Sequence, residues 1–364
     1  MSRWTFNGGA LPESAKTALI VKYAAAGDVL RTASILPGLR KRWPELRVTW
    51  VTLPGAYALL RRHPMIDELL LADDAEAAGV LEREFDLLLN FEKETEACLL
   101  ANRARANCKK GFCLTPFNTL AAFDADSNDA LQLGLDDELK FRLNRKTYPE
   151  IIYEMAGLEY ASEMYVMRLG DEERAARERL LERHPRKPGE VWIGVHTGCG
   201  PVFATKQWTL DGFVDVFHHF QDRDNVRLVL FGGEREREFN RSLIEHAGHA
   251  RVIDTGCDNS LAEFVGMVDA CDVLLSGDTL ALHVGVALGK RVVTFIGPTS
   301  ASELDLFGRG EQLVTDFSCA PCYKKQCPLD VSCMQALPAS TVIAALERQL
   351  NATREESDAM DAKP

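Results

Sequence analysis

Three groups of polar residues stand where a short apolar run gives way to a helical pattern, which is where side chains can bind or activate a ligand. The first group is the segment 26–32, with the sequence AGDVLRT, after the apolar run 17–23. Gly27 permits a tight turn, and the Asp28 carboxylate could take a proton from an attacking hydroxyl group. Aspartate is also favoured at the start of a helix, so the spacing alone is equally consistent with Asp28 as a helix cap.

The second group is the loop 196–200, with the sequence HTGCG, followed by Lys206. The small residues Thr197 and Gly198 would let backbone N–H groups approach an anion, and Lys206 would supply a positive charge. The alternative is a flexible surface loop with an incidental lysine.

The third group is the segment 276–283, with the sequence SGDTLALH. Asp278 and Thr279 can cap a helix whose first turn favours an anion by up to about 1 kcal/mol. His283 lies about one turn later, and the segment Gly297-Pro298-Thr299 follows the next apolar run. The alternative is a cap with a core histidine, but a strand, a cap, a helix and an imidazole together favour a phosphate site.

A cluster of cysteines comes near the end of the chain. Cys319, Cys322, Cys327 and Cys333 have the spacing C-x2-C-x4-C-x5-C. Four thiolates suit a closed, structural zinc or iron site. The alternatives are four reduced thiols or a disulfide formed under oxidative stress, and no adjacent base suggests a catalytic cysteine.

These groups need a scaffold, and the apolar runs predict one. Short runs rich in β-branched residues alternate with helical patterns, which indicates α/β structure with parallel sheets covered by helices on both faces. In such sheets ligands lie beyond the carboxyl ends of the strands, where the three groups stand. The expected strands are residues 17–23, 47–52, 67–71, 85–90, 191–196, 226–231, 251–254, 272–275 and 291–296.

The charged helical pattern 171–183 leads into a break with the sequence HPRKPGE, where we place a domain boundary. No G-x-G-x-x-G fingerprint is present, which argues against a dinucleotide dehydrogenase. Two such units suit the GT-B architecture, in which two Rossmann-like domains face each other across a cleft that holds the active site. The expected parts are an N-terminal extension (1–16), two Rossmann-like domains (17–185 and 186–350, the second with the Cys loop) and a disordered polar tail (351–364).

Composition excludes several classes of protein. The chain of 364 residues has a net charge of −12, and nucleic-acid binding usually needs a basic face. Its apolar runs are far shorter than the roughly 20 residues of a membrane span, and its first residues lack a signal-peptide core. We therefore expect a cytoplasmic protein that meets a membrane only peripherally, at the inner membrane. Basic clusters in the first half, including Arg103, Arg105, Lys109 and Lys110, are either solvated helix faces or an anion-binding surface.

The motifs together resemble the heptosyltransferases, glycosyltransferase family 9. The resemblance covers roughly residues 17–345 and rests on GDVLRT at 27–32, KQW at 206–208, DTxxxH at 278–283, GPT at 297–299 and a Cys cluster ending in CM at 333–334. It implies an inverting transfer without a catalytic metal, in which the N-terminal domain holds the acceptor and the C-terminal domain holds the nucleotide sugar. The implied substrates are ADP-heptose and a hydroxyl group of the lipopolysaccharide inner core.

The resemblance also implies roles for individual residues. Asp28 becomes the general base, Lys206 contacts the donor phosphates, Asp278 contacts the sugar or the phosphate-binding turn, and His283 neutralises the diphosphate. The other implied donor-binding residues are Thr197, Gly198, Thr279, Gly297, Pro298 and Thr299. The basic residues Arg31, Arg103, Arg105, Lys109 and Lys110 are the candidates for binding an anionic acceptor.

Two positions depart from the family pattern. Leu280 replaces the usual glycine, which predicts a differently shaped sugar pocket. Arg31 replaces a frequent histidine, which suits an acceptor that carries phosphate or carboxylate. Some relatives with Cys clusters modify protein serines, so a protein acceptor stays open. A GT-B nucleotide-sugar epimerase and a non-catalytic nucleotide-sugar-binding protein are further alternatives.

Overall fold

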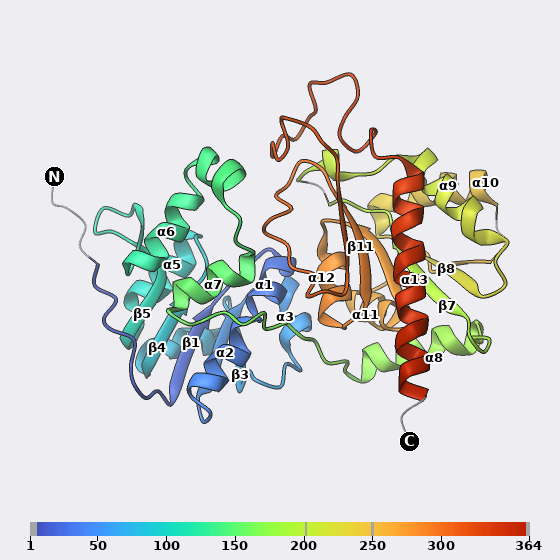
Figure 1. Ribbon diagram of the computed structural model, residues 1–364. Helices are drawn as coiled ribbons and strands as arrows, with labels where there is room; N and C mark the ends of the chain where they lie inside the picture. The colour runs from blue at the N-terminus through green and yellow to red at the C-terminus, as the bar shows by residue number, and fades with distance from the viewer. Residues whose placement is uncertain (1–5, 201, 249–250, 362–364) are drawn as a thin grey trace. The chain divides into compact units, whose positions relative to one another are not determined.

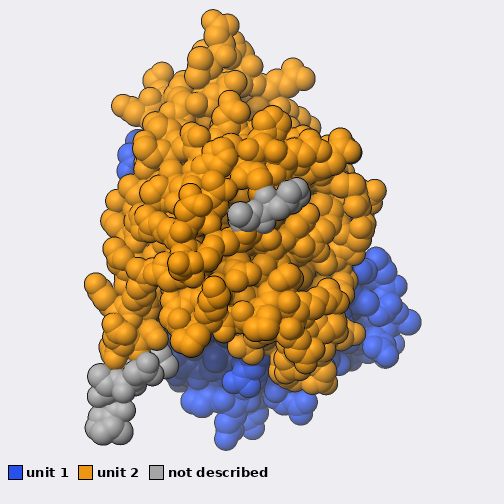
Figure 2. Space-filling view, turned by 90° about the vertical axis from the view of Figure 1, so that its right-hand side faces the viewer, with its two compact units in different colours: residues 1–168, 302–305 blue, residues 169–301, 306–364 orange. Residues whose placement is uncertain are grey.

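The computed structural model describes residues 6–200, 202–248 and 251–361. The chain divides into two compact units, which Figure 2 draws in different colours. Unit 1 comprises residues 1–168 and 302–305, and unit 2 comprises residues 169–301 and 306–364. The short segment 302–305 therefore belongs to unit 1 although it lies far along the sequence.

Unit 1 is built on a six-stranded sheet in the order β3-β2-β1-β4-β5-β6 (Figure 1). Every neighbouring pair is parallel except β5 and β6. Strand β1 lies between β2 and β4 and is almost fully buried, which explains its continuous apolar sequence. The strands are β1 (Thr17–Val21), β2 (Arg47–Thr52), β3 (Glu68–Leu71), β4 (Glu84–Asn90), β5 (Arg105–Leu114) and β6 (Leu120–Ala122).

Some helices of unit 1 begin and end at recognisable caps. Helix α7, for example, starts with a capping box formed by Thr147 and Glu150 and ends at Gly157, whose φ is 70°. The α-helices are α1 (Ala26–Thr32), α2 (Ile35–Arg42), α3 (Pro54–Leu60), α4 (Ala75–Ala78), α5 (Thr95–Arg103), α6 (Ala125–Leu133) and α7 (Tyr148–Ala156). Two short helical turns are η1 (Gly79–Glu82) and η2 (Leu139–Leu143).

Unit 2 has a second six-stranded sheet in the order β12-β11-β10-β7-β8-β9, with every pair parallel. An aromatic cluster anchors its core, since the ring centroid of Trp208 lies 5.0 Å from that of Phe213 and 5.5 Å from that of Phe295. The strands are β7 (Val191–His196), β8 (Val226–Phe231), β9 (Val252–Asp254), β10 (Val273–Gly277), β11 (Arg291–Ile296) and β12 (Gly310–Val314).

The helices of unit 2 include the long helix α13, red in Figure 1, which packs on α9 and β11. The two α/β units, each built on a largely parallel sheet, confirm the predicted GT-B fold class. The helices are α8 (Asp171–Arg183), α9 (Leu210–Gln221), α10 (Arg237–Ala247), α11 (Leu261–Asp269), α12 (Leu280–Ala287) and α13 (Ala339–Asp361), with short turns η3 (Ala204–Lys206) and η4 (Glu234–Glu236).

The division between the units comes before α8, whereas the sequence analysis placed it after that helix. Helix α8 packs closely on α11, and Gly266 makes this approach possible. A Cβ atom at Gly266 would lie only 2.1 Å from the carbonyl oxygen of Glu173. The break after α8 suggested a boundary there, but the buried face of α8 joins this helix to unit 2.

The two ends of the chain also differ from the expected extension and disordered tail. Near the N-terminus, the amide of Gly8 donates to the carbonyl of Phe123 at 2.9 Å, which ties this segment to unit 1. Helix α13 continues to Asp361 because Glu356 accepts hydrogen bonds from Arg291 (2.6 Å) and Arg309 (3.2 Å). The expected tail at 351–364 is thus helical as far as Asp361, and residues 362–364 lie outside the described part. Among the described residues, no helix is long and apolar enough to cross a membrane.

Candidate functional site

Asp28 lies in the first turn of α1, but it does not cap the helix. The N-cap is Ala25, which makes no side-chain cap hydrogen bond, so the interpretation of Asp28 as the N-cap residue is wrong. Instead, Oδ1 of Asp28 accepts hydrogen bonds from Nε (3.1 Å) and Nη2 (2.8 Å) of Arg31. The Asp28 side chain is 38% exposed and that of Arg31 is 13% exposed. The carboxylate therefore reaches solvent while the arginine beside it is mostly covered.

A buried ion pair that the sequence analysis missed lies at the start of the same loop. Lys22 follows β1 directly, and its Nζ lies 2.9 Å from Oε2 of Glu92, which comes just after β4. The same oxygen accepts from the backbone amides of Tyr23 and Ala24, each at 3.1 Å. Glu92 thereby ties the loop that leads into α1 to the end of β4. The sequence held one signal for this ion pair, because a charged residue comes shortly after each of the two apolar strands β1 and β4.

Both members of this pair stay ionised. Burial, the largest influence, lowers the pKa of Lys22, but Tyr148, Glu92 and Asp28 together raise that pKa above its ordinary value. Burial raises the pKa of Glu92, but the positive charge of Lys22 and several hydrogen bonds bring that pKa below its ordinary value. Two cations, Lys22 and Arg31, consequently lie near the Asp28 carboxylate.

The other basic candidates are not gathered into one surface. Arg103 ends α5, and Arg105 begins β5, where it pairs with Glu84 at 3.5 Å. Lys109 and Lys110 are neighbours on β5, so their side chains point to opposite faces of the sheet. Nζ of Lys109 donates to two backbone carbonyls at the end of α5, and Nζ of Lys110 lies 3.4 Å from Asp124 and 3.3 Å from Asp126.

In unit 2, the turn between β10 and α12 brings together several predicted residues. Oγ1 of Thr279 accepts from the amide of Ala281 at 3.2 Å and caps α12, as the sequence analysis predicted. Asp278 does not cap the helix, because its Oδ2 accepts from Nζ of Lys206 (2.9 Å) and Oγ1 of Thr299 (2.7 Å). Residues from three separate loops thus meet at one carboxylate.

This cluster keeps its charges although it is largely buried. Burial raises the pKa of Asp278, but Lys206 and His283 outweigh that effect, and the pKa lies below its ordinary value. The side chains of Lys206 and Asp278 are 16% and 18% exposed. An ammonium group has three donors, and two of them bond to the Asp278 carboxylate and carbonyl. Lys206 can therefore turn its remaining donor toward an anion such as a phosphate.

The small residues of the loop after β7 are needed for close packing. A Cβ atom at Gly198 would lie 2.8 Å from Cε1 of His196 and 2.9 Å from the Glu236 carboxylate. The preceding residue, Thr197, is buried and donates from Oγ1 to Asn240 at 2.5 Å. Glu236 was not predicted as a site residue, although it follows the Gly232-Gly233 turn after β8.

The cysteine-rich loop packs on the turn 297–299. The carbonyl of Pro298 accepts from the amides of Cys322 (3.0 Å) and Tyr323 (2.8 Å), and a Cβ atom at Gly297 would lie 2.7 Å from Sγ of Cys333. Burial raises the pKa of the Cys333 thiol, and the other three thiols of the cluster raise it further.

The four cysteines lie in the loop between β12 and α13 and offer the donor set of a thiolate metal site. Within the described ranges, however, no three or more His, Cys, Asp or Glu residues are gathered closely enough to hold a metal ion. The loop therefore supplies the ligand types of the predicted site without its coordination geometry.

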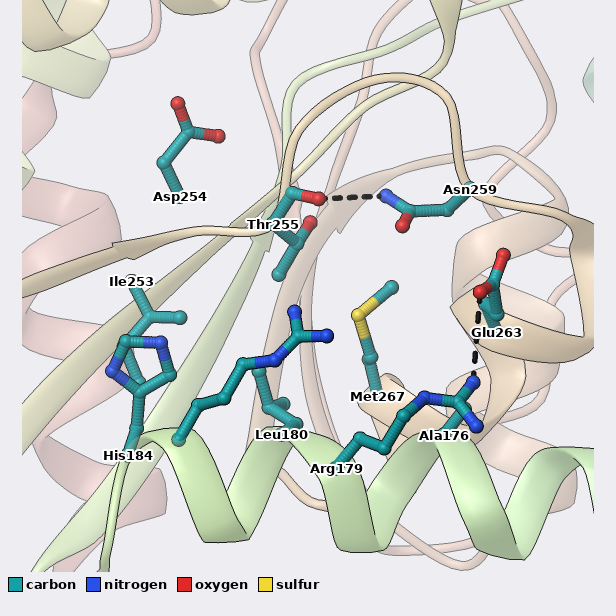
Figure 3. Close-up of a pocket in the computed structure, with 11 residues that line it drawn as sticks. Ala176, Arg179, Leu180, His184, Ile253, Asp254, Thr255, Asn259, Glu263 and Met267 are labelled. Atoms are coloured by element: carbon teal, nitrogen blue, oxygen red, sulfur yellow. Dashed lines mark hydrogen bonds and ion pairs between the residues drawn. The ribbon is translucent and has the colours of Figure 1, made fainter.

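A separate pocket of about 110 Å³ lies in unit 2, where α8, α11 and the loop after β9 meet (Figure 3). Arg179 and Glu263 form an ion pair at 3.5 Å beside it, and the side-chain amide of Asn259 donates to the carbonyl of Thr255 at 3.0 Å. None of the residues predicted from the sequence lines this pocket.

Comparisons of the sequence and the fold with known proteins show which proteins this chain resembles. The family model described as glycosyltransferase family 9 (heptosyltransferase) matches residues 78–332, more than half of the chain. Lipopolysaccharide heptosyltransferase 1 of Pseudomonas aeruginosa is 24% identical over 330 residues, covering 85% of this chain and 86% of that protein. The matched range of the family model contains the cluster around Asp278 and three of the four clustered cysteines, and it begins after Asp28.

Two solved structures share the fold. ADP-heptose lipopolysaccharide heptosyltransferase II of E. coli has a TM-score of 0.69 at 15% identity, covering 93% of this chain and 99% of that one. The dodecameric iron-containing heptosyltransferase TibC of enterotoxigenic E. coli, in complex with ADP-D-beta-D-heptose, has a TM-score of 0.56 at 10% identity. That match covers 97% of this chain and 80% of TibC.

Proposed function

Because the chain belongs to glycosyltransferase family 9, the heptosyltransferase family, we propose that it transfers a heptose from ADP-heptose to a hydroxyl group of the lipopolysaccharide inner core. The observation that carries this proposal is the convergence of Lys206 and Thr299 on Asp278 at the start of α12. Such a charged, preorganised turn at a helix N-terminus suits the diphosphate of a nucleotide sugar. The relatives named above act on lipopolysaccharide or bind ADP-heptose, which supports this choice of substrates.

In the proposed reaction, unit 2 binds the donor. Lys206 and His283 compensate the negative charge that develops on ADP as it leaves, and Thr279 keeps the first turn of α12 formed. The small residues Thr197, Gly198, Gly297 and Pro298 let the backbone approach the donor. Leu280, in place of the family's glycine, narrows the space beside the sugar.

Asp28 in unit 1 acts as the general base. The acceptor oxygen attacks the anomeric carbon on the face opposite ADP, its proton passes to the Asp28 carboxylate, and the bond between the anomeric carbon and the phosphate oxygen breaks with its electron pair on ADP. A single displacement of this kind inverts the anomeric centre. A positioned base contributes about 10²–10⁴ to the rate. We assign no step to a metal ion.

We further propose that Cys319, Cys322, Cys327 and Cys333 hold one structural zinc or iron ion. The four residues share the loop between β12 and α13, and the structurally similar heptosyltransferase TibC is described as iron-containing. When bound, such an ion would cross-link the loop between β12 and α13. Because the loop bonds to Pro298, the ion would also steady the turn 297–299.

Mass spectrometry of the products tests the proposed reaction. The full-length protein would be mixed with ADP-heptose, GDP-mannose or UDP-glucose, and with lipopolysaccharide from a strain that makes no heptose. We expect the acceptor to gain one heptose from ADP-heptose alone, and Asp28→Asn to abolish this gain while ADP binding persists.

Three outcomes would overturn the proposal. These are transfer from another donor only, recovery of an epimerised donor without transfer, and full activity of Asp28→Asn. If lipopolysaccharide gains nothing while a protein in a cell extract gains a heptose on serine, the acceptor assignment is wrong and the donor assignment stands.

A further inference from the structure

Arg31 is engaged on every side that the structure describes. Two of its nitrogens donate to Oδ1 of Asp28, and its guanidinium carbon lies 4.0 Å from the centre of the Tyr148 ring. Its third nitrogen, Nη1, lies 3.5 Å from the carbonyl oxygen of Glu303. An arginine that binds an anionic ligand presents its planar fork to that ligand. Here the fork is directed at a carboxylate of the same helix.

The partners of Arg31 are themselves held in place. The Tyr148 hydroxyl lies 2.9 Å from Oγ1 of Thr32, which also lies 2.6 Å from the carbonyl oxygen of Asp28. The Tyr148 amide donates to the carbonyl of Glu303 at 3.0 Å, so one carbonyl contacts both Tyr148 and Arg31. This ring of contacts leaves the guanidinium little freedom to turn toward a ligand.

The buried pair of Lys22 and Glu92 fixes the backbone on the other side of Asp28, since Glu92 bonds to the amides of residues 23 and 24. The charged or titratable groups near the Asp28 carboxylate include Arg31 on α1, Lys22 after β1 and Tyr148 on α7, with Glu92 balancing Lys22. Burial, the largest influence, raises the pKa of Tyr148, which therefore stays a neutral phenol.

We propose that Arg31 is a positioning residue for Asp28: it holds the carboxylate in the orientation that receives the acceptor's proton, and it does not bind the acceptor. The inference rests on the proposed function, in which Asp28 is the base. It replaces the expectation that Arg31 recognises phosphate or carboxylate on the acceptor. The physical reason is that two hydrogen bonds from one rigid, planar guanidinium to Oδ1 restrict the rotation of the carboxylate more than a single hydrogen bond would.

Two variants of the full-length protein separate positioning from binding. Arg31→Gln removes the charge and the fork, while Arg31→Lys keeps a charge but lacks the planar two-point contact. Steady-state rates would be measured with ADP-heptose and heptose-free lipopolysaccharide across pH. The matched control is Arg42→Gln, because Arg42 also stacks on an aromatic ring in unit 1, at 5.1 Å from Trp43.

We expect both variants to lose about 10²-fold in kcat, because small misplacements of reacting groups cost that much, and to keep the acceptor KM within about twofold of the parent value. In Arg31→Gln the acid limb of the pH profile should move to higher pH, because a carboxylate without its neighbouring cation binds a proton more readily. In Arg31→Lys, which keeps the positive charge, the acid limb should move little. Melting temperatures establish that each variant is folded.

Three results would overturn the inference: a rise of about tenfold or more in acceptor KM with unchanged kcat, full kcat in Arg31→Lys, or an unchanged acid limb in Arg31→Gln. Failure of the proposed function is recognised separately by Asp28→Asn. If Asp28→Asn is inactive while Arg31→Gln behaves like the parent, only the positioning role is wrong. If Asp28→Asn keeps parental turnover, Asp28 is not the base and the proposed function is wrong.

Discussion

Nζ of Lys206 lies 2.9 Å from Oδ2 of Asp278, and the same carboxylate oxygen accepts a second hydrogen bond from Thr299. The lysine is therefore held in position before any ligand arrives. A preorganised cation loses little conformational entropy on binding, so its charge contributes more of its energy to affinity.

From this arrangement we expect Lys206→Ala and His283→Ala to weaken ADP binding by roughly 1–3 kcal/mol each, the range for charge-assisted hydrogen bonds. Titration calorimetry with ADP, GDP and UDP measures the loss and shows whether it is common to all diphosphates. Lys290→Ala is the control, because Lys290 is also paired with an aspartate of unit 2, Asp269, at 3.3 Å. Parental affinity for ADP in both test variants would place the nucleotide elsewhere.

The His196 imidazole, whose Nδ1 atom is buried without a hydrogen-bond partner among the described residues, should make the protein sensitive to mild acid. Burial lowers the pKa of His196 from 6.5 to about 4. Between these pH values the unfolded chain binds a proton that the folded chain does not, so stability present above pH 6.5 is lost as the pH falls toward 4. The shift corresponds to roughly 3 kcal/mol of unfolding free energy.

Urea unfolding at neutral and mildly acid pH tests this expectation. His196→Phe keeps a ring against Phe264 but cannot titrate, so it should lose less stability on acidification than the parent. Exposed His246 provides the control variant, His246→Gln, which should follow the parent. If His196→Phe and the parent lose the same stability, the imidazole is not the source of the acid sensitivity.

The contact between α8 and α11 depends on the absence of a side chain at residue 266. Gly266→Ala should lower the unfolding free energy by about 1–3 kcal/mol, because the new methyl group would overlap the carbonyl of Glu173. Gly79→Ala is the matched control, since a Cβ atom there meets nothing within 4 Å. Chemical denaturation of the two variants compares them directly, and equal stability would show that α8 can move away without cost.

Metal content is measured by elemental analysis of protein purified without chelators. We expect about one equivalent of zinc or iron per chain, and much less in a Cys322→Ser, Cys327→Ser double variant. Loss of the ion should lower the melting temperature, because part of the binding free energy at such sites is folding free energy. If the well-folded parent protein contains less than about a tenth of an equivalent of metal per chain, the four cysteines are reduced thiols and the metal proposal is wrong.

Most strands of the two sheets could be predicted because parallel strands buried on two faces appear as apolar runs, such as residues 18–21 of β1. Strands β5, β6 and β12 were not predicted. Lys206, Asp278 and Thr299 could be chosen as candidates because each comes after a strand of one sheet, and the structure then brings them together. The pairing of Lys22 with Glu92 could not be predicted in the same way, because 70 residues separate them and each alone resembles an ordinary surface charge. The capping preference of aspartate was equally misleading at Asp28, where an arginine one turn later takes the carboxylate.

The path of the chain between the units limits how this protein can be divided experimentally. The chain leaves unit 1 after residue 168, returns for residues 302–305 and then leaves again. The returning segment supplies the carbonyl of Glu303 to Tyr148 and the carboxylate of Asp305 to the Tyr160 hydroxyl at 3.0 Å. A fragment that ends at residue 168 would lack the Glu303 carbonyl and the Asp305 carboxylate. If the protein were split at that point for complementation, the N-terminal fragment would therefore leave Tyr148 and Tyr160 without these hydrogen-bond partners. A fragment of unit 1 made to fold alone would need those four residues grafted back through a new linker.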